Sequence, residues 1–185
     1  MKKYIRDYAF LFGLAGVIIL LDQVTKSYVR SHLGVGEFWS PWDWLTPYAR
    51  FIRVHNTGAA FGSFQGMNNV FKVLAVVVAL AIVYYFPQVP RSETALRIAL
   101  GMQLGGAVGN LIDRFTQGYV TDFISVGTFP VWNVADSSVT VGVGVLLLGI
   151  WLQERHEKKA AAAAAARAEE DENEPDPAAD QEQAL

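Results

Sequence analysis

Four apolar stretches, separated by polar segments, dominate the first 152 residues of the chain. About 20 helical residues cross the hydrocarbon core of a bilayer. The stretch at 70–86 meets that length with one charge, Lys72, near its end. The other three, at 8–21, 98–112 and 139–152, reach it only if polar residues at one end lie at membrane depth. The pattern predicts four membrane-spanning helices, at about residues 8–30, 69–87, 96–114 and 135–154.

The segment between the first two predicted helices, about residues 31–68, has a different pattern. It contains three tryptophans and two prolines within "EFWSPWDWLTPYARFIRV", and its alternating "RFIRV" indicates a short strand. The dense aromatic side chains suit the boundary between membrane and water, although packing inside an external subdomain explains them equally well. The predicted fold class is an all-α membrane protein, a four-transmembrane-helix bundle with a small external β-containing or amphipathic subdomain between helices 1 and 2.

The last part of the chain, residues 153–185, differs in composition from the membrane domain, residues 1–152. Seven alanines at 160–166 precede "RAEEDENEPDPAADQEQAL", which is acidic and nearly free of large apolar groups. The tail carries ten Asp or Glu against four Lys or Arg, which leaves eleven basic and eight acidic residues, a net charge of +3, in the rest of the chain. We expect a disordered cytoplasmic appendage with a short helical start at the alanines, although a regulatory or docking role is an alternative.

Basic residues near the helix ends predict the orientation of the chain. They are concentrated on the side that both termini and the 87–96 loop share, which should therefore be cytoplasmic. These residues are Lys2, Lys3, Arg6, Arg91, Arg97, Arg155, Lys158 and Lys159. The first helix resembles a secretory signal peptide, but no small-residue cleavage site follows it, so we expect it to be retained.

Four carboxylates fall at or beside the external ends of the predicted helices. They are Asp22, Asp113, Asp122 and Asp136, half of the eight acidic residues in the membrane domain. A carboxylate within a bilayer costs a few kcal/mol or more, so such residues usually face a protein interior or a wet cavity. A functional site on the outer face is the natural hypothesis.

Asp22 and Lys26 are four residues apart on one helical face, so they can form an ion pair that supports the first helix. Asp113 and Arg114, at the end of the third helix, suggest a network that fixes the loop that follows. Asn110 lies on the same face as Asp113. The same helix carries Gly101, Gly105 and Gly109 at intervals of four, a small-residue pattern that permits close helix contact.

Asp122, in a loop after the third helix, and Asp136, just before the fourth, are the candidate reactive pair. Gly118, Gly127 and Pro130 can bend the chain and bring both carboxyls to one water. Two carboxyls that share a site cannot both ionise easily, and such a pair activates water without a metal. The alternative is that Asp136 only caps the fourth helix and Asp122 only binds loop amides.

Other chemistries have less support. The three histidines are scattered and cysteine is absent, which argues against a metal site, and we expect no metal and no cofactor. No phosphate-binding glycine loop occurs. A serine nucleophile would need Ser137 or Ser138 near Lys26 or Lys72, which no spacing requires.

Five ordered blocks resemble lipoprotein signal peptidase (signal peptidase II), a family of bacterial intramembrane aspartic peptidases. They are "DQVTK" (22–26), "HNTGAAFG" (55–62), "GGAVGNLIDR" (105–114), "GYVTDF" (118–123) and "WNVAD" (132–136). The resemblance covers about residues 8–152 and leaves the tail unexplained. Trp132 departs from the family pattern, in which Phe more often precedes the Asn.

The resemblance implies an aspartic endopeptidase that removes the signal peptide from diacylglyceryl-modified prolipoproteins, on the amino side of the lipidated cysteine. It implies catalytic roles for Asp122 and Asp136. Substrate-binding or dyad-orienting roles would fall to Asn56, Gly58, Asn110, Arg114 and Asn133, and structural support to Asp22, Lys26 and Asp113. Gly58, Ala59 and Phe61 would shape the loop that approaches the substrate.

The expected location is the bacterial cytoplasmic (inner) membrane, with an active site near the outer face. The expected partners are prolipoproteins and membrane lipid, with no nucleic acid, and the chain is expected to be monomeric. Two rival functions remain, a small ion-coupled transporter and a non-enzymatic membrane assembly factor. Buried acids also build ion pathways, but no inverted repeat supports the transporter.

Overall fold

A computed structural model describes residues 2–58 and 64–173 of the chain. Within these residues, four helices are long and apolar enough to cross a membrane. They are α1 (Lys2–His32), α2 (Asn68–Tyr85), α3 (Thr94–Thr116) and α4 (Val134–Asn173). The prediction of four membrane-spanning helices is therefore confirmed.

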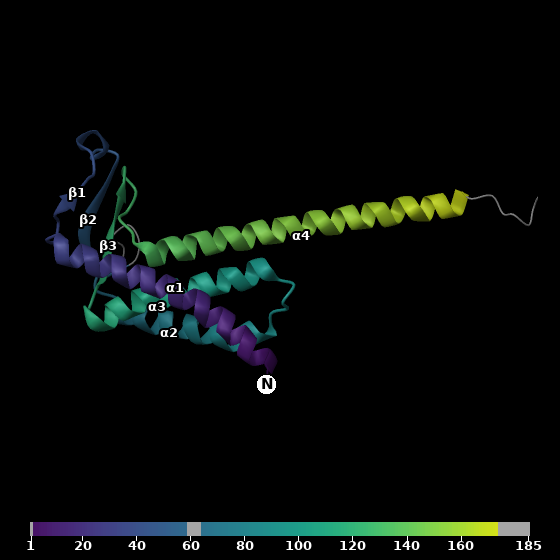
Figure 1. Cartoon of the computed structure of the whole chain (residues 1–185), viewed down its shortest axis with the longest axis horizontal. Helices are drawn as coiled ribbons and strands as arrows, with labels where there is room; N and C mark the ends of the chain where they lie inside the picture. The colour runs from purple at the N-terminus through teal and green to yellow at the C-terminus, as the bar shows by residue number, and fades with distance from the viewer. Residues whose placement is uncertain (1, 59–63, 174–185) are drawn as a thin grey trace, which may run out of the picture. The chain divides into compact units, whose positions relative to one another are not determined.

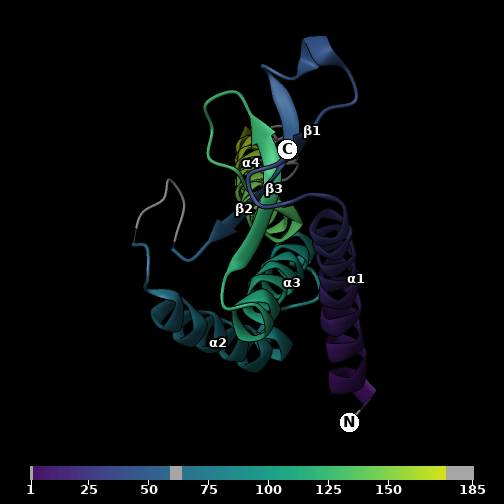
Figure 2. The same ribbon diagram turned by 90° about the vertical axis from the view of Figure 1, so that its left-hand side faces the viewer.

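Helix α3 lies between α1 and α2 in Figure 2, and α1 crosses it in the view of Figure 1. The glycine repeat explains how close α1 comes. A Cβ on Gly101 would lie 2.7 Å from the Leu14 side chain, and one on Gly105 would lie 2.8 Å from that of Ile18. The predicted close helix contact is confirmed, because a larger residue at either position would push the two helices apart.

The first turns of α4 pack against the middle of α3. A Cβ on Gly106 would lie 2.5 Å from the Ala135 carbonyl oxygen and 2.6 Å from Ser138 Oγ. Such contact leaves no room for a side chain at Gly106. The helix start that carries Asp136 is thus positioned directly by the backbone of α3.

A three-stranded antiparallel sheet lies at one end of these helices (Figure 2). Its order is β1 (Phe38–Trp39), β2 (Ala49–Asn56) and β3 (Val120–Val126). A short 3-10 helix, η1 (Asp43–Leu45), follows β1, and another, η3 (Phe86–Gln88), follows α2. The sheet joins the segment between α1 and α2 to the segment that leaves α3.

The predicted fold class is confirmed, with one element missed. The "RFIRV" segment is part of β2, as predicted. Strand β3, which contains Asp122, was interpreted as a loop because its mostly apolar sequence does not alternate. It is buried along most of its length. The side chains of Trp42 and Trp44 are mostly exposed, which favours the membrane-boundary interpretation of the aromatic residues over internal packing.

Residues 147–185 form a second unit. Its described part continues α4 as a helix to Asn173, well past the predicted end near residue 154 and the short helical start expected at the alanines. Lys158 and Glu154, four residues apart, form an exposed ion pair at 3.8 Å, of the kind that supports an isolated helix. Residues 174–185 lie outside the described part, and the disorder of the tail there stays a prediction.

Candidate active site

Asp122 lies on the central part of β3 and is buried. Its neighbour Thr121 donates its backbone N–H to Asp113 Oδ2 at 2.9 Å, which attaches the strand to the end of α3. On the other side, β3 pairs with β2, where Val54 lies opposite Asp122. The position of Asp122 is therefore determined by a sheet and by α3, which is a more rigid support than the loop that the sequence suggested.

Asp136 lies in the first turn of α4 and forms a reciprocal cap with Asn133. The backbone N–H of Asp136 donates to Asn133 Oδ1 at 3.0 Å, and the backbone N–H of Asn133 donates to Asp136 Oδ2 at 3.2 Å. This is the geometry of a capping box, with Asn at the N-cap and Asp three residues later. The capping role considered for Asp136 is therefore real.

Asn133 also connects the two aspartates. While its backbone N–H binds Asp136, its side-chain Nδ2 donates to Asp122 Oδ1 at 2.7 Å. Both carboxylates line one cavity of about 540 Å³. Asp122 accepts its side-chain hydrogen bonds from asparagine amides, so the alternative that it binds only loop amides does not describe its contacts.

Two further asparagines complete the set of donors. Asn56, at the end of β2, donates Nδ2 to Asp122 Oδ2 at 2.9 Å, and Asn110, on α3, donates Nδ2 to Asp136 Oδ1 at 2.8 Å. Asn56 Oδ1 also accepts the backbone N–H of Gly58 at 2.9 Å, which orients its amide. Each carboxylate oxygen of the pair thus accepts a hydrogen bond from an uncharged donor.

The electrostatic result is clearest at Asp122. Burial first, and then the nearby charge of Asp136, raise the pKa of this carboxyl from 3.8 to about 7. Hydrogen bonds from Asn56 and Asn133 oppose the shift without cancelling it. With its pKa raised in this way the carboxyl keeps its proton to higher pH than an ordinary aspartate, and a proton donor must carry its proton when it acts.

Arg114 lines the same cavity from the last turn of α3. Its NH2 approaches the Gly58 carbonyl oxygen at 3.5 Å, a long hydrogen bond, and its guanidinium lies 5.4 Å from the centre of the Phe71 ring. Its Nε is buried without a hydrogen-bond partner among the described residues. Arg114 thus places a positive charge beside the carboxylates without forming an ion pair with them. Ala59 and Phe61 lie outside the described residues.

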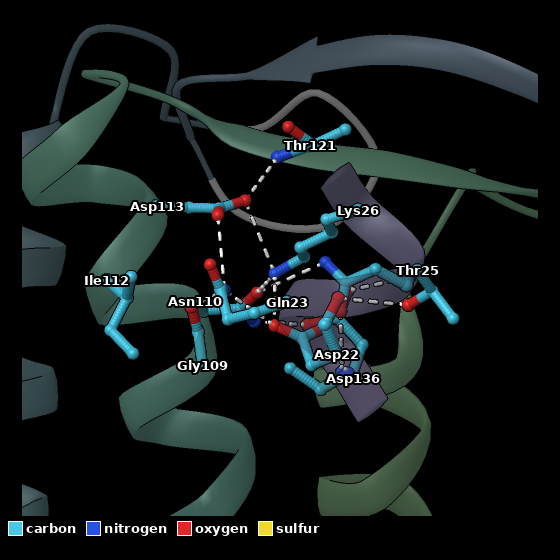
Figure 3. A network of polar contacts seen from close by, with 12 residues as sticks. Asp22, Gln23, Thr25, Lys26, Gly109, Asn110, Ile112, Asp113, Thr121 and Asp136 are labelled. Atoms are coloured by element: carbon cyan, nitrogen blue, oxygen red, sulfur yellow. Dashed lines mark hydrogen bonds and ion pairs between the residues drawn. The ribbon is translucent and has the colours of Figure 1, made fainter. Parts of the chain in front are cut away.

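A second polar cluster, which we call the charge lattice, lies beside the pair (Figure 3). Its centre is Lys26, whose side chain is 0% exposed and lies 2.8 Å from Asp22 Oδ2 and 3.3 Å from Asp113 Oδ2. Arg30 adds a second cation at 3.3 Å from Asp113 Oδ1. The ion pair predicted for Asp22 and Lys26 is confirmed, and Asp113 joins it from α3.

The charge lattice determines how the site residues are oriented. Asp22 Oδ1 accepts the backbone N–H of Ala135 at 3.0 Å, which holds the start of α4 against α1. Lys26 Nζ donates to Asn110 Oδ1 at 2.8 Å, and Asn133 Nδ2 donates to the same oxygen at 3.1 Å. Because that oxygen is occupied by two donors, the Nδ2 of Asn110 must face Asp136.

Three members of the charge lattice were not singled out from the sequence. Gln23 Nε2 donates to the Gly109 carbonyl oxygen at 3.0 Å, and Arg30 NH1 donates to Thr121 Oγ1 at 3.2 Å. Gln23 lies inside the "DQVTK" block, which was the available signal for it. Thr121 lies inside the "GYVTDF" block, which was the corresponding signal for it. Nothing in the local sequence distinguishes Arg30, since its partners Asp113 and Thr121 are more than 80 residues away.

Serine chemistry has no support in the contacts. Ser137 Oγ donates to the Asn133 carbonyl oxygen at 2.9 Å, and Ser138 Oγ donates to that of Ala135 at 2.7 Å. Trp132 Nε1 donates to Ser137 Oγ at 3.1 Å, so the residue that departs from the family pattern adds a contact beside the cap. Within residues 2–58 and 64–173, no group of three or more His, Cys, Asp or Glu could hold a metal ion.

Comparisons with known proteins agree with this geometry. A family model described as signal peptidase (SPase) II matches residues 14–152. A lipoprotein signal peptidase of Shouchella clausii is 42% identical over 145 residues, which are 77% of this chain and 93% of the relative. One of Dehalococcoides mccartyi is 44% identical over 137 residues, 71% of this chain and 83% of the relative.

The fold is also known from solved structures. A structure described as a bacterial membrane enzyme at 2.3 Å resolution superposes with a TM-score of 0.71 at 28% identity, covering 78% of this chain and 88% of that one. The region matched by the family model begins within α1, ends within α4 and includes both aspartates of the pair. The chain belongs to the signal peptidase II family.

Proposed function

We propose that the chain is a membrane endopeptidase that removes the signal peptide from diacylglyceryl-modified prolipoproteins, on the amino side of the lipidated cysteine. Membership of the family makes it a peptidase of lipoprotein processing. The finer proposal is that Asp122 and Asp136 activate water for this cleavage. The observation that carries it is the double contact of Asn133, which binds both carboxylates at the wall of one cavity.

We assign different roles to the two aspartates. Asp136 lies at the N-terminus of α4, where a helix favours negative charge, so it is the ionised general base. Asp122 lies on a buried strand without a helix terminus, and burial raises its pKa to about 7, so it is the protonated partner. Environments that separate two carboxyls in this way define the acid and the base of a pair.

In the proposed reaction, the Asp136 carboxylate takes a proton from the water while the water oxygen attacks the scissile carbonyl carbon. The O–H of Asp122 donates a hydrogen bond to the developing oxyanion. As the carbon–nitrogen bond breaks, Asp122 passes its proton to the leaving amine of the cysteine. One proton then moves from Asp136 to Asp122, which restores the starting state.

The cavity walls suit a substrate that is part peptide and part lipid. Besides the polar groups of the site, the lining residues include Phe129, Val131, Val139 and Val141. Lipid chains that remain in the bilayer add about 0.8 kcal/mol of anchoring per buried methylene. Substrate selection would therefore come partly from the membrane, with the site near the outer face and both termini cytoplasmic. We also propose that the enzyme acts as a monomer in the bacterial inner membrane.

The test is cleavage of a purified lipid-modified prolipoprotein in detergent by the wild type, Asp122→Asn and Asp136→Asn. We expect both variants to lose at least about a thousandfold in kcat, since each removes a proton-transfer group of the pair. Asp43→Asn, an exposed position on η1, is the matched control and should cleave normally.

Substantial cleavage by a folded Asp122→Asn or Asp136→Asn variant would contradict the proposed pair. An ion flux across vesicles that depends on Asp122, without any cleavage by the wild type, would favour the transporter instead.

A further inference from the structure

A second charged cavity, which we call the arginine cavity, lies where the N-terminal parts of α1 and α3 meet the loop after η3. Its volume is about 390 Å³, and its walls include Arg6, Asp7 and Phe10 from α1, with Arg91 and Arg97 from the loop and α3. None of these residues belongs to the charge lattice or lines the cavity of the aspartate pair. The cavity therefore needs an explanation of its own.

The arginine cavity has more positive than negative charge. Three arginines and one aspartate are among its lining residues, so positive charge exceeds negative charge there. Asp7 Oδ1 accepts hydrogen bonds from Arg91 Nε at 3.0 Å and from Arg97 NH2 at 2.8 Å. Arg97 is buried in this contact, whereas the Arg91 side chain is 42% exposed and Arg6 is exposed. Two accessible arginines at the mouth of a cavity favour an anion.

Asp7 contributes a second, independent signal. The residue is 1% exposed, and its Oδ2 is buried without a hydrogen-bond partner among the described residues. A buried carboxylate oxygen without a donor is costly, and such groups are rare in folded proteins. A ligand that presents a hydroxyl or ammonium donor beside its anionic group would satisfy this oxygen.

An apolar track leads from the arginine cavity along α1. Arg6, Phe10, Gly13 and Val17 follow one another at helical spacing, and the last three are exposed. A Cβ placed on Gly13 would meet nothing within 4 Å, so the track has open space at that point. Val17 lies about 16 Å deeper along the helix axis than Arg6, given a rise of about 1.5 Å per residue. That depth matches much of one lipid leaflet.

We propose that the arginine cavity binds the headgroup of an anionic phospholipid with hydroxyl donors, of the phosphatidylglycerol type. The phosphodiester lies against Arg6 and Arg91, a headgroup hydroxyl donates to Asp7 Oδ2, and one acyl chain follows Phe10, Gly13 and Val17. Both α1 and α3 enter their membrane-spanning segments here, so the cavity lies at the depth of lipid headgroups. Basic pockets between transmembrane helices commonly bind such headgroups.

The test is lipid binding to the full chain in detergent, measured by native mass spectrometry with phosphatidylglycerol and with phosphatidylcholine of the same acyl chains. We expect the wild type to bind phosphatidylglycerol at least tenfold more tightly. The double variant Arg6→Gln, Arg91→Gln should lose that preference. The matched control Arg155→Gln, Lys158→Gln removes two exposed charges outside the cavity and should keep it.

Two further comparisons use the wild type alone, so they do not depend on the folding of a variant. Phosphatidylmethanol has the same charge but no headgroup hydroxyl, and we expect severalfold weaker binding because Asp7 Oδ2 then stays without a donor. Millimolar inorganic phosphate should leave phosphatidylglycerol bound. Three results would each overturn the proposal. They are equal binding of phosphatidylglycerol and phosphatidylcholine, equal binding of phosphatidylglycerol and phosphatidylmethanol, and full displacement of phosphatidylglycerol by inorganic phosphate.

Discussion

Two pairs of carboxylates, all buried except the partly buried Asp136, lie close together in this molecule but differ in what surrounds them. Asp22 and Asp113 share the buried ammonium of Lys26, and Asp113 also pairs with Arg30. Among the described residues, Asp122 and Asp136 accept hydrogen bonds from uncharged groups, namely three asparagine side chains and one backbone N–H. The first pair forms direct ion pairs with cations, whereas the second pair has the charge of Arg114 nearby without a direct ion pair to it.

This difference separates a structural role from a chemical one. A buried carboxylate that forms ion pairs with a shared cation contributes by holding two helices in one arrangement. A carboxylate that has only neutral donors and a second carboxylate nearby can hold or release a proton near neutral pH, as the raised pKa of Asp122 indicates. Four acids that look alike in the sequence thus divide into two classes once their partners are known.

The largest expected effect comes from removal of the central cation. Lys26→Met leaves Asp22 and Asp113 buried without the charge that they share, and breaking a buried ion pair in this way costs about 3–5 kcal/mol. We expect a large fall in the Tm measured by thermal unfolding in detergent. Lys72→Met is the matched control, because Lys72 lies over the Phe115 ring and forms no ion pair among the described contacts.

Equal Tm values for Lys26→Met and Lys72→Met would contradict the stabilising role that we assign to the charge lattice.

The next largest effect is on the pH dependence of cleavage, which we expect the pair Asp122 and Asp136 to determine. If protonated Asp122 is the donor, kcat/KM should fall about tenfold per pH unit above its pKa of about 7, and hence about a hundredfold by two units higher. A pH–rate profile measures this. A profile that stays flat through that range would remove the proton-donor role from Asp122.

The free energy of unfolding should also depend on pH through the Asp122 carboxyl, with a slope opposite to that of an acid whose pKa is lowered by an ion pair. The folded state keeps the proton up to about pH 7, whereas the unfolded carboxyl releases it near its ordinary value of 3.8. Between these values the folded state binds more protons, so the free energy of unfolding contributed by Asp122 falls as pH rises and levels off above about 7. Asp122→Asn should remove this part of the slope in Tm against pH.

The helices and the glycine contacts could be predicted because they follow from local rules. Hydropathy and length identify four spans, and glycines at intervals of four identify the face of α3 that meets α1. Strand β3 could not be predicted in this way. The strand has only seven residues, and it is stabilised by pairing with β2, which lies more than 60 residues away in the chain.

The site was predictable as a set of residues but not as an arrangement. The ordered blocks single out Asp122, Asp136 and the asparagines, yet no spacing reveals that Asn133 binds both carboxylates through different atoms. Likewise, the capping and catalytic interpretations of Asp136 were weighed as alternatives. The contacts make them compatible, since one oxygen accepts the cap hydrogen bond and the other accepts Asn110 Nδ2.

A smaller effect should follow from a shift of α4 against α3. Gly106→Ala introduces a Cβ at 2.5 Å from the Ala135 carbonyl oxygen, and overpacking of this kind costs about 1–3 kcal/mol. The start of α4 must move, and Asp136 moves with it, so we expect kcat to fall by up to about a hundredfold. Gly13→Ala, at an open position on α1, is the matched control for both kcat and Tm.

Normal activity in Gly106→Ala would mean that the close contact of α3 and α4 does not determine the position of Asp136.

The smallest expected effect on stability separates the two roles of Asn133. Asn133→Ala removes the N-cap side chain of α4, which costs about 1 kcal/mol, whereas Asn133→Ser can keep the cap through its hydroxyl oxygen. Both variants lose the Nδ2 donor to Asp122. We therefore expect Ser to recover most of the Tm that Ala loses, while cleavage stays equally impaired in the two variants. Recovery of cleavage together with Tm in Asn133→Ser would mean that Asn133 acts only as a cap, and that the second carboxylate pair does not depend on its side-chain amide.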